Sequence, residues 1–393
     1  MVKNYGYKIM SFTGLLYCLL SSCISAFEPV GVEDTAGILV VEGLILDKST
    51  TSIHLSRTVK LDQQLPVTSV DVYNATIQLI DEENNVIAVA EQQIKDNMPV
   101  GGTYVFNDAI SFAPAQKYAL DIWIGNQHYR SAFVSPVHTP EIDEISWALN
   151  DDKSIDIRVS THDPDNQTNY FLWAFEEDWE IRSPLFGNPR YDPQSRTFIE
   201  QSLYGPNNRF YCWSSDQSKS LLLGSSDKLS ESIISNKKIH QIQPYTTRFS
   251  YLYSILVKQY GLDKEAYGYF ENLQRNVEES GSLFAPQPSE KAGNIQCLSN
   301  PNEPVIGYIA ITKETMYRLF INVATLNLGD RSSCDEGESV DFPDLYGAYL
   351  LGLGIHYAEV PDKLYQCVPI RCVDCTQRGG TKNKPDFWPN DHQ

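Results

Sequence analysis

The strand signal that decides the fold is residues 38–46, which read ILVVEGLIL. Aliphatic side chains fill nearly all of this stretch, and such residues favour a pleated surface that is at least half buried. Shorter segments follow as far as residue 135, and in them apolar and polar residues alternate. About seven short strands separated by polar turns are typical of a sandwich. We therefore predict an immunoglobulin-like β-sandwich over residues 38–135.

A break in the strand pattern follows at residues 135–140, where Pro136 and Pro140 interrupt the alternation. Prolines in a polar stretch mark turns and boundaries between units. Beyond them, residues 141–393 again show strand-like segments and carry a cysteine-rich C-terminal segment. We predict a second, larger, β-rich domain over residues 141–393, so the chain as a whole is expected to be mainly β.

One amphipathic helix is predicted within this second unit, over residues 263–279. Asp263 is a suitable N-cap, and Ser280-Gly281 ends the pattern. Apolar residues fall on one face at helical spacing: Leu262, Ala266, Phe270, Leu273 and Val277. We expect this face to pack on the core rather than to bind a ligand.

The N-terminus has the pattern of an export signal. Lys3 and Lys8 precede a short apolar run over residues 10–20, which then leads into Leu20-Ser21-Ser22-Cys23. An aliphatic residue, two small residues and a cysteine are typical of a bacterial lipoprotein signal. We predict a signal peptide over residues 1–22, a lipidated Cys23 and a tether over residues 23–37. The alternatives are an ordinary secretory signal and an uncleaved anchor.

Composition limits the class of partner. The chain has 31 Lys and Arg against 50 Asp and Glu, a formal net charge of −19. Nucleic acid is an unsuitable partner, because phosphate binding needs a basic surface. Several aromatic residues are candidates for stacking on a ligand or burial in a partner, although most such residues pack in cores: Trp173, Trp179, Tyr204, Tyr211 and Trp213.

Six cysteines remain when Cys18 and Cys23 are set aside with the signal: Cys212, Cys297, Cys334, Cys367, Cys372 and Cys375. An even number in an exported protein favours disulfides, and six cysteines allow 15 connectivities. The close spacing of Cys367, Cys372 and Cys375 also fits a zinc site with Cys334 or His392 as the fourth ligand. A thioredoxin-like Cys-x-x-Cys motif would need a βαβ context, which the sequence does not indicate. Disulfides are the favoured interpretation, and we expect no metal or cofactor.

Two acidic segments are candidates for chemistry. Residues 162–166, His-Asp-Pro-Asp-Asn, resemble a calcium loop, but an Asp-Pro turn explains them better. On a strand, Glu176, Asp178 and Glu180 would share one face, next to Glu177, and paired carboxylates can hydrolyse glycosidic bonds. The sequence offers no serine-hydrolase elbow, no zinc-protease motif and no phosphate loop. These acids support a surface hydrolase only as an alternative.

Several motifs together resemble the Bacteroidetes lipoproteins grouped as domain of unknown function 4249. They are Phe27-Glu28-Pro29, residues 39–43 (LVVEG), residues 262–267 (LDKEAY), Cys372-Val373-Asp374-Cys375 and residues 384–388 (KPDFW). The resemblance implies no established activity and no catalytic residues. It implies an outer-membrane lipoprotein encoded near TonB-dependent transporters, with exposure on the cell surface left open. We therefore expect a non-catalytic accessory subunit for binding or assembly, held to the membrane through its lipid and associated with such a transporter.

Overall fold

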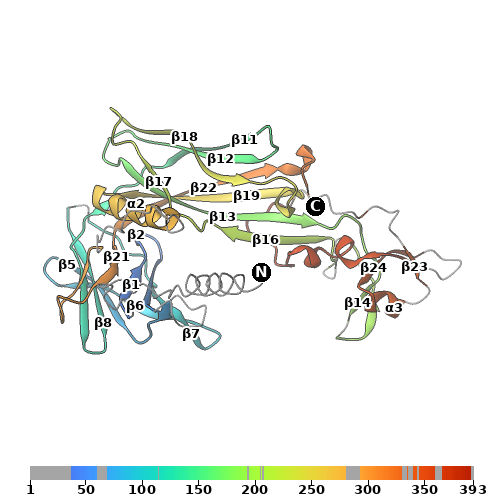
Figure 1. Ribbon diagram of the computed structural model, residues 1–393, viewed down its shortest axis with the longest axis horizontal. Helices are drawn as coiled ribbons and strands as arrows, with labels where there is room; N and C mark the ends of the chain where they lie inside the picture. The colour runs from blue at the N-terminus through green and yellow to red at the C-terminus, as the bar shows by residue number, and fades with distance from the viewer. Residues whose placement is uncertain are drawn as a thin grey trace, which may run out of the picture.

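The computed structural model describes residues 37–390 apart from 60–68, 114, 193, 204, 206–207, 280–292, 330–333, 335–339, 343–344 and 359–364. The predicted signal peptide and Cys23 lie outside these residues. Strands dominate the described chain, which confirms the prediction of a mainly β protein. The molecule is elongated, with an N-terminal sheet at one end and small C-terminal elements at the other (Figure 1).

The N-terminal unit is a sheet that curls until it is nearly closed. Its strands follow the order β20-β9-β8-β5-β6-β7-β3-β1-β21, and β4 pairs with β3. Strand β6 pairs with β5 through its first half and with β7 through its second half, so the sheet bends around its core at this strand. The bounds are β1 Leu39–Glu42, β3 Thr51–Thr58, β4 Ser69–Asp71, β5 Thr76–Asp81, β6 Val86–Lys95, β7 Met98–Phe106, β8 Tyr118–Ile124, β9 Gln127–Ser131, β20 Ile295–Cys297 and β21 Val305–Gly307.

The alternation seen in the sequence forms the core of this unit. Every second residue points inward, as Ile53 and Leu55 do on β3 and Ile77 and Leu79 do on β5. However, residues 38–135 do not make the sheet alone. Strands β20 and β21 close its two ends, pair with β9 and β1, and lie against each other. Each has three residues, too few for a periodic pattern to assign it to this unit.

Residues 38–46 form two strands rather than the single strand we predicted. Strand β1 joins the N-terminal sheet, whereas β2 (Ile45–Asp47) pairs with β22 in the next sheet. Gly43 lies between them with φ +147, and a Cβ there would approach the Ser52 carbonyl oxygen to 2.6 Å. The chain therefore changes sheets at a position where only glycine fits.

The middle of the molecule is a two-layer β-sandwich. One layer has the order β10-β22-β19-β13-β16, with β17 beside β13 and β2 beside β22, and the other has the order β11-β12-β18. Large side chains such as Trp173, Tyr253 and Ile157 fill the space between the layers. The bounds are β10 Pro136–Val137, β11 Ile142–Leu149, β12 Ile155–Asp163, β13 Tyr170–Arg182, β16 Tyr211–Gln217, β17 Leu222–Ser225, β18 Ser232–Ile242, β19 Leu252–Leu262 and β22 Ile311–Asn322.

The predicted helix forms as α2, Lys264–Glu279. The Asp263 carboxylate accepts a hydrogen bond from the Ala266 backbone N–H at 2.7 Å, as expected of an N-cap. Leu262 and Ala266 are buried, and Phe270 packs beside them. Leu273 is 38% exposed, so the apolar face covers the core only along the first turns of the helix.

At the far end lies what we call the C-terminal cap, residues 183–210 together with residues 340–378. It contains the β14–β15 hairpin, the sheet β23-β25-β24, and the short helices α3, η4 and η5 (Figure 1). Their bounds are β14 Arg190–Asp192, β15 Thr197–Ile199, β23 Val340–Phe342, α3 Leu345–Leu350, β24 Leu353–Ala358, β25 Tyr365–Pro369, η4 Ile370–Cys372 and η5 Cys375–Arg378. Two further short helices lie in the sandwich, η1 Thr247–Phe249 and η2 Val323–Leu326.

Two disulfides hold the cap, Cys212–Cys375 and Cys334–Cys372. The prediction for Cys297 is wrong, because its thiol is buried in the N-terminal core on β20, opposite Tyr129 of β9. Cys367 takes part in neither of these bonds, and it is buried on β25 against Ala348 and Ile355. The zinc alternative fails because Cys372 and Cys375 are bonded to other cysteines. His392 lies outside the described residues.

Candidate functional site

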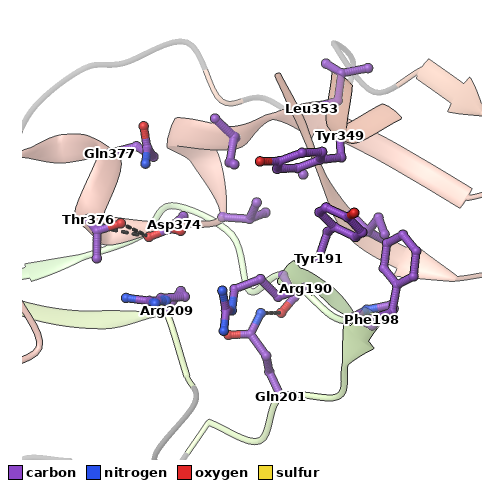
Figure 2. A pocket seen from close by; sticks show the side chains of 16 residues that line it. Arg190, Tyr191, Phe198, Gln201, Arg209, Tyr349, Leu353, Asp374, Thr376 and Gln377 are labelled. Carbon is purple, nitrogen blue, oxygen red and sulfur yellow. Dashed lines mark hydrogen bonds between the residues drawn. The ribbon is translucent and has the colours of Figure 1, made fainter. Parts of the chain in front are cut away.

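A cavity of about 250 Å³ opens in the C-terminal cap, between two chain segments that are far apart in sequence (Figure 2). One wall comes from residues 187–209, including the β14–β15 hairpin, and the other from residues 349–377. The walls are hydrogen-bonded, since the backbone N–H of Leu185 donates to Cys372 O at 2.9 Å and that of Asn188 donates to Ile355 O at 3.0 Å. The cavity therefore exists only when both segments are in place.

Tight packing fixes the distance between the walls. A Cβ on Gly187 would meet the Val373 Cβ at 2.7 Å and the Ile355 carbonyl oxygen at 3.1 Å. Real Cβ atoms do not approach so closely, so the missing side chain at residue 187 lets the two segments touch.

One side of the cavity is aromatic. Tyr191 packs on Tyr349 with ring centroids 4.3 Å apart, and it lies opposite Phe198 across the hairpin at 5.1 Å. Burial, together with the neighbouring Tyr346 and Tyr349 phenols, raises the pKa of the Tyr191 phenol. These rings are tilted against one another, and together they offer an aromatic, partly polar surface to a bound molecule.

Two arginines lie in the lining, Arg190 of β14 and Arg209, which precedes β16 (Figure 2). The Nε atom of each is buried and has no hydrogen-bond partner. Within the described part of the chain, neither guanidinium has a carboxylate within 4.0 Å. Asp374 also lines the cavity, but its Oδ1 accepts bonds from the Thr376 N–H at 2.9 Å and the Thr376 hydroxyl at 2.6 Å. Buried donors without acceptors are rare in folded proteins and need an explanation.

Gln201 supplies the third unsatisfied group. Its side chain is buried, with 8% of the residue exposed. Its Nε2 donates to the Gly187 carbonyl oxygen at 2.7 Å, which fixes the orientation of the amide. The Oε1 atom is then left without a donor. The lining therefore combines two unmet donors with one unmet acceptor.

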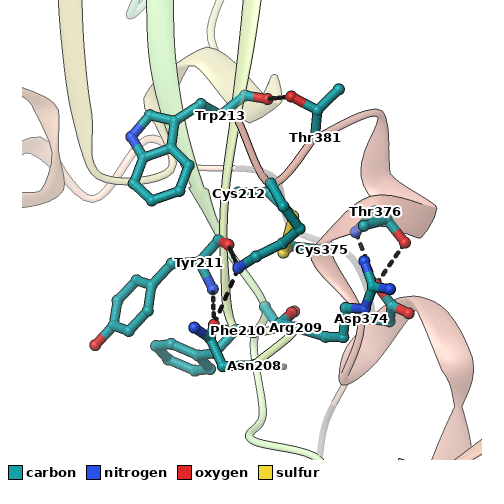
Figure 3. The surroundings of a disulfide bond; sticks show 12 residues. Asn208, Arg209, Phe210, Tyr211, Cys212, Trp213, Asp374, Cys375, Thr376 and Thr381 are labelled. Carbon is teal, nitrogen blue, oxygen red and sulfur yellow. Dashed lines mark hydrogen bonds between the residues drawn. A yellow bond between two sulfur atoms is a disulfide. The ribbon is translucent and has the colours of Figure 1, made fainter. Parts of the chain in front are cut away.

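The Cys212–Cys375 disulfide joins the two walls beside the cavity (Figure 3). Around it, Cys375 N–H donates to Arg209 O at 2.8 Å, and Trp213 and Thr381 exchange backbone hydrogen bonds of 2.8 Å each. Lys382 donates to the carbonyl oxygen of Tyr211 and to the Asn208 side chain at 3.2 Å. Burial, with the charge of Arg209 nearby, lowers the pKa of Lys382 to about 8.

The acids proposed for hydrolysis lie elsewhere, on β13. As predicted, Glu176, Asp178 and Glu180 share one side of that strand. Each is engaged: Glu176 by Lys258 at 2.6 Å, Asp178 by Arg318 at 3.5 Å, and Glu180 by Arg182 at 2.8 Å and the Trp388 indole at 3.2 Å. A carboxylate held by a cation is poorly placed to accept a proton from water.

Glu177 points to the opposite side of β13, into the sandwich core. It accepts bonds from Tyr253 at 2.6 Å and Arg248 at 2.7 Å, and its Oε2 lies 3.2 Å from His240 Nε2. Burial alone would raise the pKa of Glu177, but these partners hold it below its ordinary value. Burial raises the pKa of Tyr253 well above its usual range. This network is a structural feature of the core.

The other residues that the sequence suggested as candidates have structural roles where the structure describes them. Trp173 and Trp179 are core residues of the sandwich, while Tyr211 and Trp213 pack against Trp388. Tyr204 lies outside the described residues. Residues 162 and 163 end β12, and Asp163 accepts backbone bonds from Asp165, Gln167 and Thr168, so a turn follows the strand. Among the residues that the structure describes, no cluster of His, Cys, Asp and Glu could hold a metal ion.

The model of one family, described as "Domain of unknown function (DUF4249)", matches residues 24–318. The chain belongs to this family. The match to DUF4249 includes the first wall of the cavity and ends before the second, residues 349–377.

Other comparisons add little to the DUF4249 assignment. No curated protein matches the chain. Among solved structures, the collagen adhesin of S. aureus shares 8% identity over 73% of this chain and 96% of that chain, with a TM-score of 0.09. In the described ranges, no helix has the length and apolar character needed to cross a membrane.

Sequence reasoning missed Arg190, Gln201 and Arg209. They lie in residues 183–210, where short strands alternate with loops and no periodic pattern marks a site. Only the cysteines gave a signal, because Cys212 and Cys375 bring the two walls together. Their pairing was not predictable from the sequence.

Proposed function

We propose that this DUF4249 protein is a non-catalytic, lipid-anchored binding protein that works outside the cytoplasm as an accessory subunit of a TonB-dependent outer-membrane transporter. The observation that carries the binding role is the cavity in the C-terminal cap. Its buried Arg190, Arg209 and Gln201 atoms lack partners within the described chain. Pockets that bind small molecules typically combine apolar walls with a few placed polar groups.

Two features support a location outside the cytoplasm. Disulfides persist in oxidising compartments, and two of them fasten the cap. The leader ending in Leu20-Ser21-Ser22-Cys23 supports attachment through lipid on Cys23. The transporter partner is inferred from the resemblance of this chain to lipoproteins encoded near such transporters.

The lack of catalysis is inferred from the acids on β13. The hydrolase alternative needs one carboxyl group that gives up a proton and another that is free to attack or activate water. Glu176, Asp178 and Glu180 are instead engaged by lysine, arginine or indole groups. Their arrangement therefore favours a structural role.

Metabolic labelling with an azide-bearing palmitate tests the anchor. We expect label on the wild-type protein and on a Cys18→Ala control, and none on Cys23→Ala. The Cys23→Ala protein should also leave membranes in a carbonate wash. Label that persists on Cys23→Ala would overturn the anchor.

Cross-linking in native membranes followed by affinity purification and mass spectrometry tests the partner. We expect a TonB-dependent channel to be enriched with the wild-type protein and depleted with Cys23→Ala. Recovery of the wild-type protein alone would contradict the transporter role.

A further inference from the structure

We propose that the cavity of the C-terminal cap binds a small anion that also carries hydroxyl groups, such as a sugar acid or a sugar phosphate. This inference rests on the proposed binding function and names the class of ligand. It follows from the unmet donors of Arg190 and Arg209, the unmet acceptor of Gln201 and the aromatic wall around Tyr191.

The two arginines favour an anionic ligand. A guanidinium is a planar fork of donors that matches the oxygens of a carboxylate or a phosphate. A half-buried arginine can pair with a carboxylate of its own chain, as Arg248 does with Glu177 in this structure at 2.7 Å. Arg190 and Arg209 have no such partner within the described residues and share one cavity. The acceptor that completes them therefore comes from outside the protein.

The charge of the whole chain makes this positive site distinctive. The formal net charge is −19, so the average field around the molecule repels anions. The binding energy must come from close contacts with the two arginines rather than from long-range attraction. Asp374 in the same lining carries a negative charge, which favours an anion with its charge concentrated at one end.

Gln201 favours a ligand that also carries a hydrogen-bond donor. Its Nε2 donates to the Gly187 carbonyl oxygen at 2.7 Å, so only Oε1, an acceptor, is left without a hydrogen-bond partner. A carboxylate, or a phosphate in its main dianionic form, has no proton to donate at neutral pH, whereas a hydroxyl does. The rings of Tyr191 and Tyr349 suit the apolar face of a sugar ring. A cavity of about 250 Å³ suits a molecule of one ring.

Isothermal titration calorimetry on the full mature protein in detergent tests the ligand class. The probes are D-glucuronate, D-glucose 6-phosphate, neutral D-glucose and acetate. We expect at least one of the two sugar anions to bind at least tenfold more tightly than glucose and than acetate. The tighter of the two identifies carboxylate or phosphate as the anionic group. Equal binding of glucose, or no binding of either sugar anion to folded protein, would overturn the proposal.

Variants assign the effect to the cavity. We expect Arg190→Gln and Arg209→Gln each to weaken binding of the sugar anion at least tenfold. Arg190→Lys should restore only part of the affinity, because lysine keeps the charge but lacks the fork. The matched control is Arg196→Gln, which removes an exposed arginine from the turn of the same hairpin. Unchanged binding in both lining variants, or an equal loss in the control, would contradict the assignment.

A further variant, Gln201→Leu, tests the hydroxyl contact. It should reduce the preference for the sugar anion over acetate, with circular dichroism confirming the fold. An unchanged preference would remove the hydroxyl from the proposal. Transporter cross-linking is measured on the wild type and on the same arginine variants. If the channel is still recovered while no sugar anion binds to the wild type, the ligand class fails and the accessory role stands.

Discussion

At the scale of single residues, the neighbours Glu176 and Glu177 show how a strand separates two environments. Glu176 is 47% exposed in its side chain and pairs with Lys258, whereas the Glu177 side chain is 2% exposed and holds three partners. Exposed ion pairs contribute little to stability, while breaking a buried one leaves charge without compensation. A carboxylate is therefore expected to contribute very differently to stability at these two adjacent positions.

We predict that Glu177→Gln lowers the free energy of unfolding by roughly 3–5 kcal/mol, the usual effect of breaking a buried pair. The matched change Glu176→Gln should alter it by about 0–1 kcal/mol. Urea unfolding followed by tryptophan fluorescence measures both. Similar effects for the two variants would show that Glu177 is not the anchor of a buried network.

Lys382 gives a prediction about pH. Its pKa is about 8 in the folded protein, against 10.5 for an ordinary lysine. Between these values the unfolded chain binds more protons than the folded one, so stability rises with pH in that window. The wild type should therefore gain stability relative to Lys382→Met as pH rises from 8 to 10.5. Tyrosines that titrate in this range are common to both proteins and cancel in the difference, which denaturant unfolding at several pH values measures. A difference that stays flat would place the pKa of Lys382 near its ordinary value.

At the scale of elements, the Cys212–Cys375 disulfide is the covalent link between the two chain segments that form the cavity. It links residues 163 apart, whereas Cys334–Cys372 links residues 38 apart. Because a cross-link stabilises more when it closes a longer loop, the two bonds should differ in effect.

We predict that replacing both Cys212 and Cys375 with serine lowers the free energy of unfolding by roughly 2–5 kcal/mol. The loss should exceed that of the double change at Cys334 and Cys372 by about 1 kcal/mol, from the ratio of loop lengths. Sugar-anion binding should disappear in the first variant. Chemical unfolding and calorimetry measure these effects, and full binding without the Cys212–Cys375 bond would show that the walls hold together unaided.

The elements also show what local sequence determines. The helix was predictable because the Asp263 cap and the apolar spacing depend on residues that are close together in the sequence. The exposure of Leu273 was not, because it depends on where the neighbouring strands end. The change from one sheet to the next at Gly43 was not predictable for the same reason. The residues on both sides of Gly43 favour strands, and only the partner strands show that these strands belong to two sheets.

At the scale of the whole molecule, long-range pairing decides the organisation. Residues 38–135 contain most of the N-terminal sheet, but β20 and β21 arrive from residues 295–307 and bring Ile295 and Val305 into its core. The cavity is likewise built from two distant segments. Short strands and paired walls carry no local period, so the sequence predicted the mainly β class but not the closure of the sheet or the site.

We predict that a fragment of residues 37–140 does not unfold cooperatively on its own. Without β20 and β21, the outer edges of β9 and β1 are open, and such edges promote aggregation. Fusing residues 293–310 to the fragment through a flexible linker should restore a cooperative transition. Thermal unfolding by circular dichroism compares the two, and a cooperative, monomeric fragment would show that the closing strands are dispensable.

The central claim is that Arg190, Arg209 and Gln201 form one binding site in the C-terminal cap. A crystal structure of the mature protein grown with the tighter-binding sugar anion tests it most directly. The account predicts the anionic group between the two guanidinium groups, and a ligand hydroxyl within hydrogen-bond distance of Gln201 Oε1. An empty cavity in which a carboxylate of the chain itself pairs with both arginines would contradict it.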